Sequence, residues 1–446
     1  MSLDSYIKEM ANAIAAEKPY VLQELLTINP GHERGTQRAN FGDPSDIDLY
    51  TLPEKFHAVV RAYLRAMRSI YIASDLRASF VNLKELLVCL NRAAESQTNW
   101  ICPALINCSD ELISVYQVRA RQFPEPSASP GDLGDLGDLG DETAKKDSPL
   151  EMVAAIINQS FKICLTDKNL DAATSKKLSI PFFLAALLKI YFKLGKLELA
   201  KSVEKALAAT RHTIPTRHNT PAFARKHAVT YLYYSALLSL NDSDFEAAEG
   251  KLCTTLDFLA CYSRLRVVAK PSEKVLVLLV PLKMANSCRT LSASKWATYP
   301  ALSYIYRDRL FAALNTGHLR AFDHWTFRFL RVFHHRYLYI LVLHLRSLCI
   351  LRLFQRTHRL YAELALELPH IVPFSAFQLA LKFSRSYDDK LHETTAADPE
   401  SRLPDVDYGE VECLLANFIQ RRQIKGYLLH SNKCIVLLKT APFLAA

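Results

Sequence analysis

The chain has 446 residues, 50% of them hydrophobic and only 12 of them glycine, and it carries a formal net charge of +10 at pH 7. This length can bury a large core in about two or three domains, and the scarcity of glycine argues against a sheet-rich enzyme with many tight turns. The positive charge indicates an acidic partner, either nucleic acid or an acidic protein, although a merely basic protein explains the charge equally well.

The cysteines and the apolar segments exclude two further classes of protein. The ten cysteines are scattered and none forms a Cys-x-x-Cys pair, so we expect reduced thiols in an intracellular compartment. The first residues do not read as a signal peptide. Residues 275–280 are too short to span a membrane, and residues 337–354 contain His344, Arg346 and Arg352, which are costly in lipid.

Residues 1–122 are predicted to form an N-terminal helical region. Apolar residues recur at helical spacing over residues 2–16, 83–94 and 104–120, and Pro53 suits the first turn of a helix that runs to about Ile72. Residues 123–149 then contain Pro124, Pro126 and Pro130 and three Gly-Asp-Leu triplets. Such an acidic, low-complexity stretch predicts a disordered loop, because it buries too little apolar surface to offset the entropy of ordering.

Residues 150–360 read as pairs of helices joined by tight polar turns. The expected pairs are 182–192 with 197–207, 227–240 with 245–259, and 305–314 with 318–333. The second pair has aromatic and alanine placement like a tetratricopeptide repeat, although the spacing is irregular. One helical hairpin cannot bury its own apolar face, so the pattern predicts an all-α, TPR-like solenoid of stacked hairpins.

Residues 361–446 are expected to form a winged helix with a small β-hairpin. Helices are predicted at 338–354, before this domain, and at 374–383, within it; a polar, acidic insert follows at 386–404. Further on, Val411, Leu414, Leu415, Phe418 and Ile419 place one apolar face on a helix. Two β-prone runs around the polar turn 431–433 complete the hairpin. Such a module binds nucleic acid or docks protein.

Helical repeats that end in a winged helix are the pattern of PCI-domain proteins, which the chain resembles. The likeness is greatest to the branch that contains the PCI subunit of the TREX-type mRNA-export complex and the signalosome-associated twelfth subunit. The motifs that carry it, over about residues 180–446, are Leu-Leu-Ala-Asn-Phe-Ile and Ile-Lys-Gly-Tyr-Leu-Leu-His within 407–430, Val-Pro-Leu-Lys-Met at 280–284, the turn at 316–323 and the Pro-Phe at 442–443. The PCI domain is expected at roughly 225–443. Two departures are Arg421-Arg422-Gln423, where the family tends to have a glycine, and Leu444 in place of a final proline.

The resemblance implies a function in assembly. We expect a non-enzymatic scaffold and nucleic-acid-binding subunit of a nuclear complex that couples transcription to mRNA processing and export, with a cytoplasmic location left open. The expected partners are a larger scaffold protein of that complex, RNA or DNA, and a small acidic, disordered subunit shared with the proteasome lid. The alternative is a protein-binding subunit of a signalosome-like complex with no nucleic-acid role.

The charge pattern supplies the candidate nucleic-acid-binding residues. Residues 324–360 hold seven arginines and no acidic residue, and residues 413–446 hold five basic residues and again no acid. Seven of these cations are expected to contact phosphates: Arg352, Arg356, Arg359, Arg421, Arg422, Lys425 and Lys433. The other interpretation is a solvated helix face that neighbouring subunits neutralise, or a groove for the acidic partner.

Other clusters predict structure and not chemistry. His334 and His335 lack nearby carboxylates or cysteines and suit the end of a helix better than a metal site, and Asp242 and Asp244 suit a helix cap. The basic stretch from Arg211 to His227 is expected to be an ordinary exposed loop. We find no phosphate-binding glycine loop and no nucleophile motif, so we expect no catalytic site, no metal site and no cofactor.

Overall fold

The computed structural model describes residues 2–123, 148–169, 171, 174–210, 216–217, 220–262, 266–364, 368–386 and 405–443. The chain divides into two compact units, Met1–Tyr234 and Ser235–Ala446, and the boundary between them falls inside one helix. The described residues are mostly helical, with one small sheet near the C-terminus. The predicted fold class, a helical solenoid that ends in a winged helix, is confirmed.

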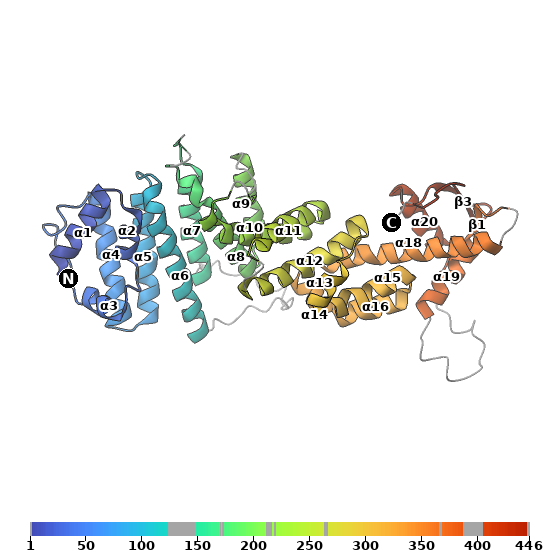
Figure 1. Cartoon of the computed structure of the whole chain (residues 1–446), viewed down its shortest axis with the longest axis horizontal. Helices are drawn as coiled ribbons and strands as arrows, with labels where there is room; N and C mark the ends of the chain where they lie inside the picture. Colours follow the sequence, from blue (N-terminus) through green and yellow to red (C-terminus); the bar gives the residue numbers. More distant parts are fainter. Residues whose placement is uncertain are drawn as a thin grey trace, which may run out of the picture. The chain divides into compact units, whose positions relative to one another are not determined.

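The first unit is a stack of helices in which consecutive helices pack side by side. Figure 1 shows α4, α5, α6 and α7 standing next to one another, and their buried faces form the core of this unit. Its helices are α1 (Leu3–Ala15), α2 (Pro19–Leu26), α3 (His32–Ala39), α4 (Glu54–Tyr71), α5 (Leu76–Ala94), η1 (Asn99–Ile101), α6 (Cys102–Gln122), α7 (Pro149–Leu165), η2 (Lys176–Ser179), α8 (Ile180–Leu194), α9 (Leu197–Ala209), η3 (Ala222–Ala224) and the first part of α10 (Arg225–Asn241).

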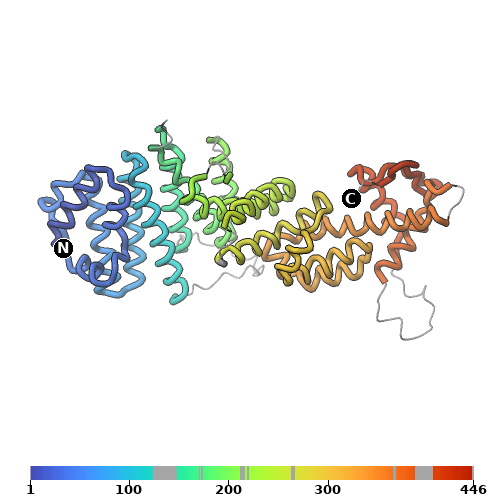
Figure 2. Tube along the Cα trace, viewed as in Figure 1, coloured from blue at the N-terminus to red at the C-terminus, as the bar shows by residue number. Residues whose placement is uncertain are grey.

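The second unit continues with helix pairs and ends in the winged helix. Figure 2 shows that the long helix α18 leads directly into the terminal domain. The elements are α11 (Phe245–Ala260), η4 (Arg266–Val268), α12 (Ala269–Ser287), α13 (Ala293–Thr298), α14 (Pro300–Leu302), the π-helix η5 (Ser303–Phe311), α15 (Ala312–Thr316), α16 (Leu319–Arg328), α17 (Leu330–His335), α18 (Tyr339–Leu364), β1 (Ile371–Pro373), α19 (Phe374–Ser386), α20 (Tyr408–Gln420), β2 (Gly426–Leu429) and β3 (Cys434–Leu437).

The predicted helix–turn–helix pairs are present, and their turns have the expected chemistry. Gly195 and Gly317 end α8 and α15 in the left-handed conformation, with φ of 71° and 74°, which glycine adopts without steric cost. The Asp244 carboxylate accepts a hydrogen bond from the Ala247 N–H and so caps α11, as predicted. His334 and His335 lie in the last turn of α17, also as predicted.

Several predicted boundaries were wrong. The helix expected at 83–94 begins at Leu76, because the Asp75 carboxylate caps it about two turns earlier. The helix expected at 318–333 is divided near Phe329 into α16 and α17, and the one expected at 338–354 continues for ten more residues to Leu364. Ser148 caps α7, so helix already begins at Pro149. The acidic insert at 387–404 and the low-complexity stretch at 124–147 lie outside the described residues.

The sheet has three strands, one more than the predicted hairpin. Its order is β1-β3-β2, both pairings are antiparallel, and Ile371 pairs with Val436 while Gly426 pairs with Leu437. Strand β1 immediately precedes α19, so the sheet edge ties the beginning of the winged helix to its end. In the described part of the chain, no helix is both long and apolar enough to cross a membrane.

Candidate nucleic-acid interface

Three of the predicted cations lie together where α20 ends and the wing begins. The apolar face of α20 is buried through Val411, Leu415 and Phe418, which fixes the direction in which the helix ends. Three backbone hydrogen bonds close the turn: Arg422 N–H donates to the Ile419 carbonyl, and the N–H groups of Gln423 and Ile424 donate to the Phe418 carbonyl. Ile424 is buried, whereas the side chains of Arg421, Arg422 and Lys425 are exposed on one end of the domain.

The wing itself depends on a glycine. A Cβ atom at Gly426 would lie 2.4 Å from the Val436 carbonyl oxygen, so only glycine allows β2 and β3 to approach this closely. The resemblance motif Ile-Lys-Gly-Tyr therefore places Lys425 directly before a position that has no room for a side chain. The Lys425 N–H also donates to the Pro442 carbonyl, at 2.7 Å, which holds the C-terminal segment against the start of the wing.

Lys433 lies at the opposite end of the same helix. Its ammonium group sits 4.8 Å from the ring centroid of Tyr408, the first residue of α20, and the hairpin turn also places His430 against the Glu412 carboxylate, with its Nδ1 2.8 Å from Oε1. Arg421 follows the last residue of α20. A helix of 13 residues spans about 20 Å. The structure therefore does not bring Lys433 together with the other three cations of the wing.

The three arginines of α18 have different surroundings. The Arg356 Nη1 donates to the Thr316 carbonyl at 2.8 Å and so caps the end of α15, and the Arg352 Nη1 donates to Gln355 Oε1 at 3.3 Å. Arg359 is exposed. Two of these side chains thus contribute hydrogen bonds within the domain, which sequence spacing did not reveal.

Two histidines show which side of α18 faces the wing. The His358 ring lies 5.6 Å from the Phe443 ring, and burial lowers the pKa of His344, with a further contribution from the nearby Arg421 charge. At about 100° per residue, these histidines lie roughly a quarter turn around α18 from the three arginines. Arg359 is the nearest of the three to the wing side. The α18 arginines and the wing cations therefore occupy adjoining flanks and not one face.

Several carboxylates in the described part of the second unit have cationic partners. Arg346 contacts Asp323 at 2.7 Å, Arg385 contacts Glu410, and Lys382 lies 3.6 Å from Asp405. Within the described ranges, Arg359, Arg421, Arg422 and Lys425 form no ion pair with a carboxylate. All four side chains are exposed, and we define Arg421, Arg422 and Lys425 as the wing-base cluster.

Sequence reasoning missed the residue that joins the repeats to the winged helix. The buried Ser384 hydroxyl, on α19, donates to the Gly317 carbonyl at 2.7 Å and accepts from the Leu319 N–H at 2.8 Å. It thereby satisfies both sides of the turn between α15 and α16. No local pattern identifies it, because Ser384 lies 65 residues from Leu319 along the chain.

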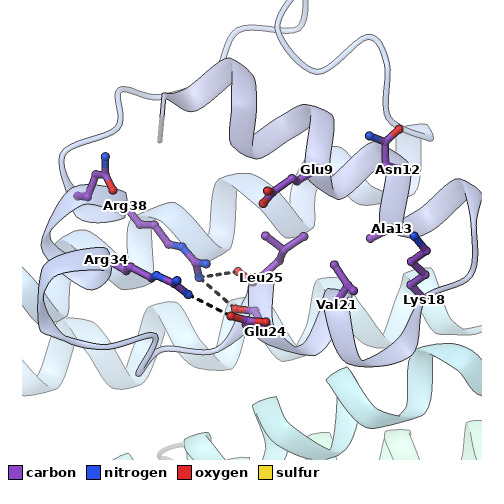
Figure 3. Close-up of a pocket in the computed structure, with 10 residues that line it drawn as sticks. Glu9, Asn12, Ala13, Lys18, Val21, Glu24, Leu25, Arg34 and Arg38 are labelled. Carbon is purple, nitrogen blue, oxygen red and sulfur yellow. Dashed lines mark hydrogen bonds and ion pairs between the residues drawn. The ribbon is translucent and has the colours of Figure 1, made fainter.

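A polar hollow lies in the first unit, and the polar groups in it form hydrogen bonds that hold the helices together. Figure 3 shows this hollow of about 600 Å³, where the buried Arg38 donates through Nη1 to the carbonyls of Glu24 and Leu25. Its Nη1 also donates to the Tyr63 hydroxyl, which ties α3 to α4. Among the residues that the structure describes, no three His, Cys, Asp or Glu side chains gather as metal ligands would.

Comparisons with known proteins agree with this architecture. No family model matches the chain. A CSN12 homolog of Debaryomyces hansenii is 46% identical over 442 residues, which cover 99% of this chain and 98% of that protein. PCI domain-containing protein 2 of Danio rerio is 23% identical over 99% of this chain and 98% of its own length. COP9 signalosome complex subunit 12 of Eremothecium gossypii is 28% identical over 79% of each chain.

Stacked helical hairpins that end in a winged helix define the class of PCI-domain proteins. Within that class, the chain belongs to the branch of the CSN12 homologs and PCI domain-containing protein 2. The suspected family is therefore confirmed. The likeness also extends over nearly the whole chain, well beyond the residues 180–446 that the motifs cover.

Proposed function

We propose that the chain is a non-enzymatic scaffold and nucleic-acid-binding subunit of a nuclear complex that couples transcription to mRNA processing and export. The observation that carries this proposal is the wing-base cluster: three exposed cations at one end of a winged helix, without carboxylate partners in the described ranges, while Asp323 and Glu410 are paired with other arginines. Such cations attract phosphates and give binding that depends strongly on salt.

The proposed mechanism is binding to the phosphate backbone without reading of the bases. The wing-base cluster binds the phosphates most directly, and Arg359 extends the path along the adjoining flank of α18. Arg356 is exposed apart from its hydrogen bond to Thr316, and it adds charge to the same region, while Arg352 adds its charge from a half-buried position. Lys433 contributes from the other end of α20 only to a strand long enough to cover about 20 Å.

The proposed partners are proteins as well as nucleic acid. Helices of the repeats dock a larger scaffold protein, and a small acidic, disordered subunit shared with the proteasome lid binds the terminal unit. Exposed apolar side chains on that unit support a protein contact: Leu379 and Phe383 on α19 are 60% and 59% exposed, and Tyr427 on β2 is 59% exposed. Isolated exposure is common on protein surfaces, but Leu379 and Phe383 lie one turn apart on the same side of a helix.

The second candidate function is a protein-binding subunit of a signalosome-like complex with no nucleic-acid role. The relative from Eremothecium gossypii carries the name COP9 signalosome complex subunit 12, which favours this alternative. In this case the wing-base cluster serves the acidic partner, and nucleic acid does not compete for it.

A triple variant separates the two functions: Arg421→Ala, Arg422→Gly and Lys425→Ala. Glycine is chosen at position 422 because φ is positive there. The control variant loses three exposed lysines of the same unit, Lys270→Ala, Lys274→Ala and Lys295→Ala. Binding of single-stranded RNA and of duplex DNA, each of mixed sequence, is titrated at several salt concentrations, with the acidic partner present.

The proposed function predicts that the triple variant weakens binding about equally for all sequences. The slope of log affinity against log salt should fall by about 0.7 to 0.9 for each phosphate that the variant no longer neutralises, depending on the strand type. The control should retain the wild-type slope. Unchanged affinity and slope in the triple variant, with the acidic partner bound normally, would exclude the cluster from the nucleic-acid surface. Loss of the acidic partner with unchanged affinity for nucleic acid would instead establish the second candidate.

A further inference from the structure

An apolar hollow of about 720 Å³ opens in the first unit, far along the chain from the winged helix. It is built from α2, η1, the start of α6, η2 with α8, and η3 with α10. Its lining includes the aromatic and aliphatic side chains Tyr20, Trp100, Ile106, Leu178, Phe182 and Phe223. Segments that lie about 200 residues apart in the sequence therefore supply one concave apolar surface.

Two aromatic side chains at this hollow are left in solvent. Tyr20 is 76% exposed and Phe223 is 66% exposed, although both line the hollow. Trp100 also lines the hollow, but it is buried and its indole N–H donates to Gln97 Oε1 at 3.2 Å, so this part of the lining is fixed. Large exposed aromatic side chains beside a buried, apolar lining are typical of sites that receive an apolar anchor from a partner.

A second, smaller hollow of about 220 Å³ adjoins the first and is basic. The two share Asp110, Phe182 and His227 in their linings. The smaller hollow adds three exposed lysines: Lys189 and Lys193, one turn apart on α8, and Lys226 on α10. We call the two hollows together the α6–α8 groove. It has an aromatic end and a lysine end within one compact unit.

We propose that the α6–α8 groove binds a segment of a partner protein that carries one or two large apolar side chains beside a short run of acidic residues. The apolar side chains enter the larger hollow between Tyr20 and Phe223. The acidic side chains meet Lys189, Lys193 and Lys226, since opposite charges at the rim of an interface select the partner and set its register.

The lining favours a peptide over nucleic acid. Glu17 in the larger hollow and Asp110 in both hollows can accept hydrogen bonds from the backbone N–H groups of a peptide, donors that a sugar–phosphate backbone lacks. A volume of about 720 Å³ also accommodates two large apolar side chains, and most of its lining offers them apolar contacts. This site goes beyond the proposed function, which rests on cations of the other unit.

The test selects peptides directly on the full chain. A phage-displayed library of random peptides, each long enough to cover both hollows, is selected on the immobilised protein, and enriched peptides are synthesised with a fluorescent label and titrated by anisotropy. We expect the enriched peptides to combine large apolar residues with Asp or Glu. Replacing their acidic residues by lysine, or their apolar residues by serine, should each weaken binding about tenfold or more.

Two variants and a matched control locate the binding. Lys189→Glu with Lys226→Glu reverses the lysine end, and Phe223→Ala removes an exposed ring without altering the buried core. Each should weaken the enriched peptides about tenfold. Lys162→Glu with Lys205→Glu, two exposed lysines of the same unit outside the groove, should bind them as the wild type does. The wing-base triple variant should also bind them normally, which separates this proposal from the proposed function.

Four outcomes would overturn the proposal. The first is a selection that enriches no peptide, and the second is enriched peptides that bind both groove variants as tightly as the wild type. The third is an oligouridylate that binds the wild type but not the Lys189→Glu, Lys226→Glu variant, while no peptide binds the wild type. In that case the groove would be a nucleic-acid surface. The fourth is a dimer in sedimentation that Phe223→Ala converts to monomer, which would make a second copy of the chain the occupant.

Discussion

Arg422 holds the least favourable backbone conformation in the wing-base cluster. Its φ is 60°, in the left-handed region that favours glycine. A non-glycine residue in this region costs about 1 to 2 kcal/mol, because Cβ approaches the following carbonyl. The arginine is therefore a charge placed at a position where glycine would be more stable.

Replacing Arg422 by glycine should separate stability from binding. We expect Arg422→Gly to raise the free energy of unfolding by about 1 kcal/mol. We also expect it to lower the slope of log affinity against log salt by about 0.7 to 0.9, which is the contribution of one phosphate contact. The control is Arg421→Gly, where φ is −76° and glycine should cost about 0.5 to 1 kcal/mol. Urea unfolding and salt titration measure both quantities. A destabilised Arg422→Gly variant would contradict the expected relief of strain.

Two partly buried histidines of α18 should make stability fall in mild acid. Burial is the main cause that lowers the pKa of both His344 and His358, with smaller contributions from Arg421 and Arg359. Above about pH 6.5 each imidazole is neutral in the folded and unfolded chain alike. Below that pH the unfolded chain binds protons that the folded chain resists, so the free energy of unfolding decreases until the pH passes below the folded pKa.

The corresponding experiment compares urea unfolding at about pH 7.5 and about pH 5, on either side of the ordinary histidine pKa. The double variant His344→Phe with His358→Phe keeps a ring against Phe245 and Phe443 and removes the titration, so it should lose less stability between the two pH values than the wild type. His335→Phe, at an exposed position, should follow the wild type. A double variant with the full wild-type loss would show that other groups cause the pH dependence.

At the scale of elements, the turn between α15 and α16 is where the helical repeats contact the winged helix, and we call this contact the joint. Gly317 lies against α18, the Arg356 guanidinium caps the preceding carbonyl, and Ser384 from α19 bonds to both sides of the turn. Two helices, α18 and α19, thus converge on one tight turn. The orientation of the wing-base cluster within the second unit depends on this packing.

Two glycines with the same backbone conformation test that joint. A Cβ at Gly317 would meet the Leu353 backbone at 2.9 Å, whereas a Cβ at Gly195 would meet nothing within 4 Å. Gly195→Ala should cost only the left-handed penalty of about 1 kcal/mol. Gly317→Ala adds overpacking of about 1 to 3 kcal/mol and should also weaken nucleic-acid binding, because the wing is displaced. Equal costs for the two substitutions in thermal or urea unfolding would show that α18 gives way without strain.

At the scale of the whole molecule, the exposed apolar and basic surface of the terminal unit should make the chain dependent on a partner. We expect poor solubility when the chain is expressed alone and a larger soluble, monodisperse fraction when it is expressed with the small acidic subunit of the proteasome lid. The physical reason is the exposure of Leu379, Phe383 and Tyr427 in the same unit as the wing-base cluster. Size-exclusion chromatography measures both states. A monodisperse chain that does not shift with that subunit would count against the partner assignment.

Much of the fold could be predicted because its signals are local. The apolar face of α20, the tight turn between α8 and α9 and the Asp244 cap of α11 each depend on residues close together in the sequence, and all three were correctly predicted. The hairpin of β2 and β3 follows from a short polar turn. Family motifs in the same segments identified the PCI class, which the likeness over the whole chain then confirmed.

The candidate site depended on interactions that no local pattern contains. Strand β1 pairs with β3 far along the chain, Ser384 bonds to a turn 65 residues away, and the α6–α8 groove draws on segments from α2 to α10. The charge pattern marked Arg352, Arg356, Arg359 and Lys433 as candidates, but only packing assigned Arg356 to the cap of α15 and set Lys433 apart from the wing-base cluster. Periodicity in the sequence shows which side of a helix or strand is apolar. Only the packing of distant segments decides which neighbour covers that side and which cations then remain exposed to a ligand.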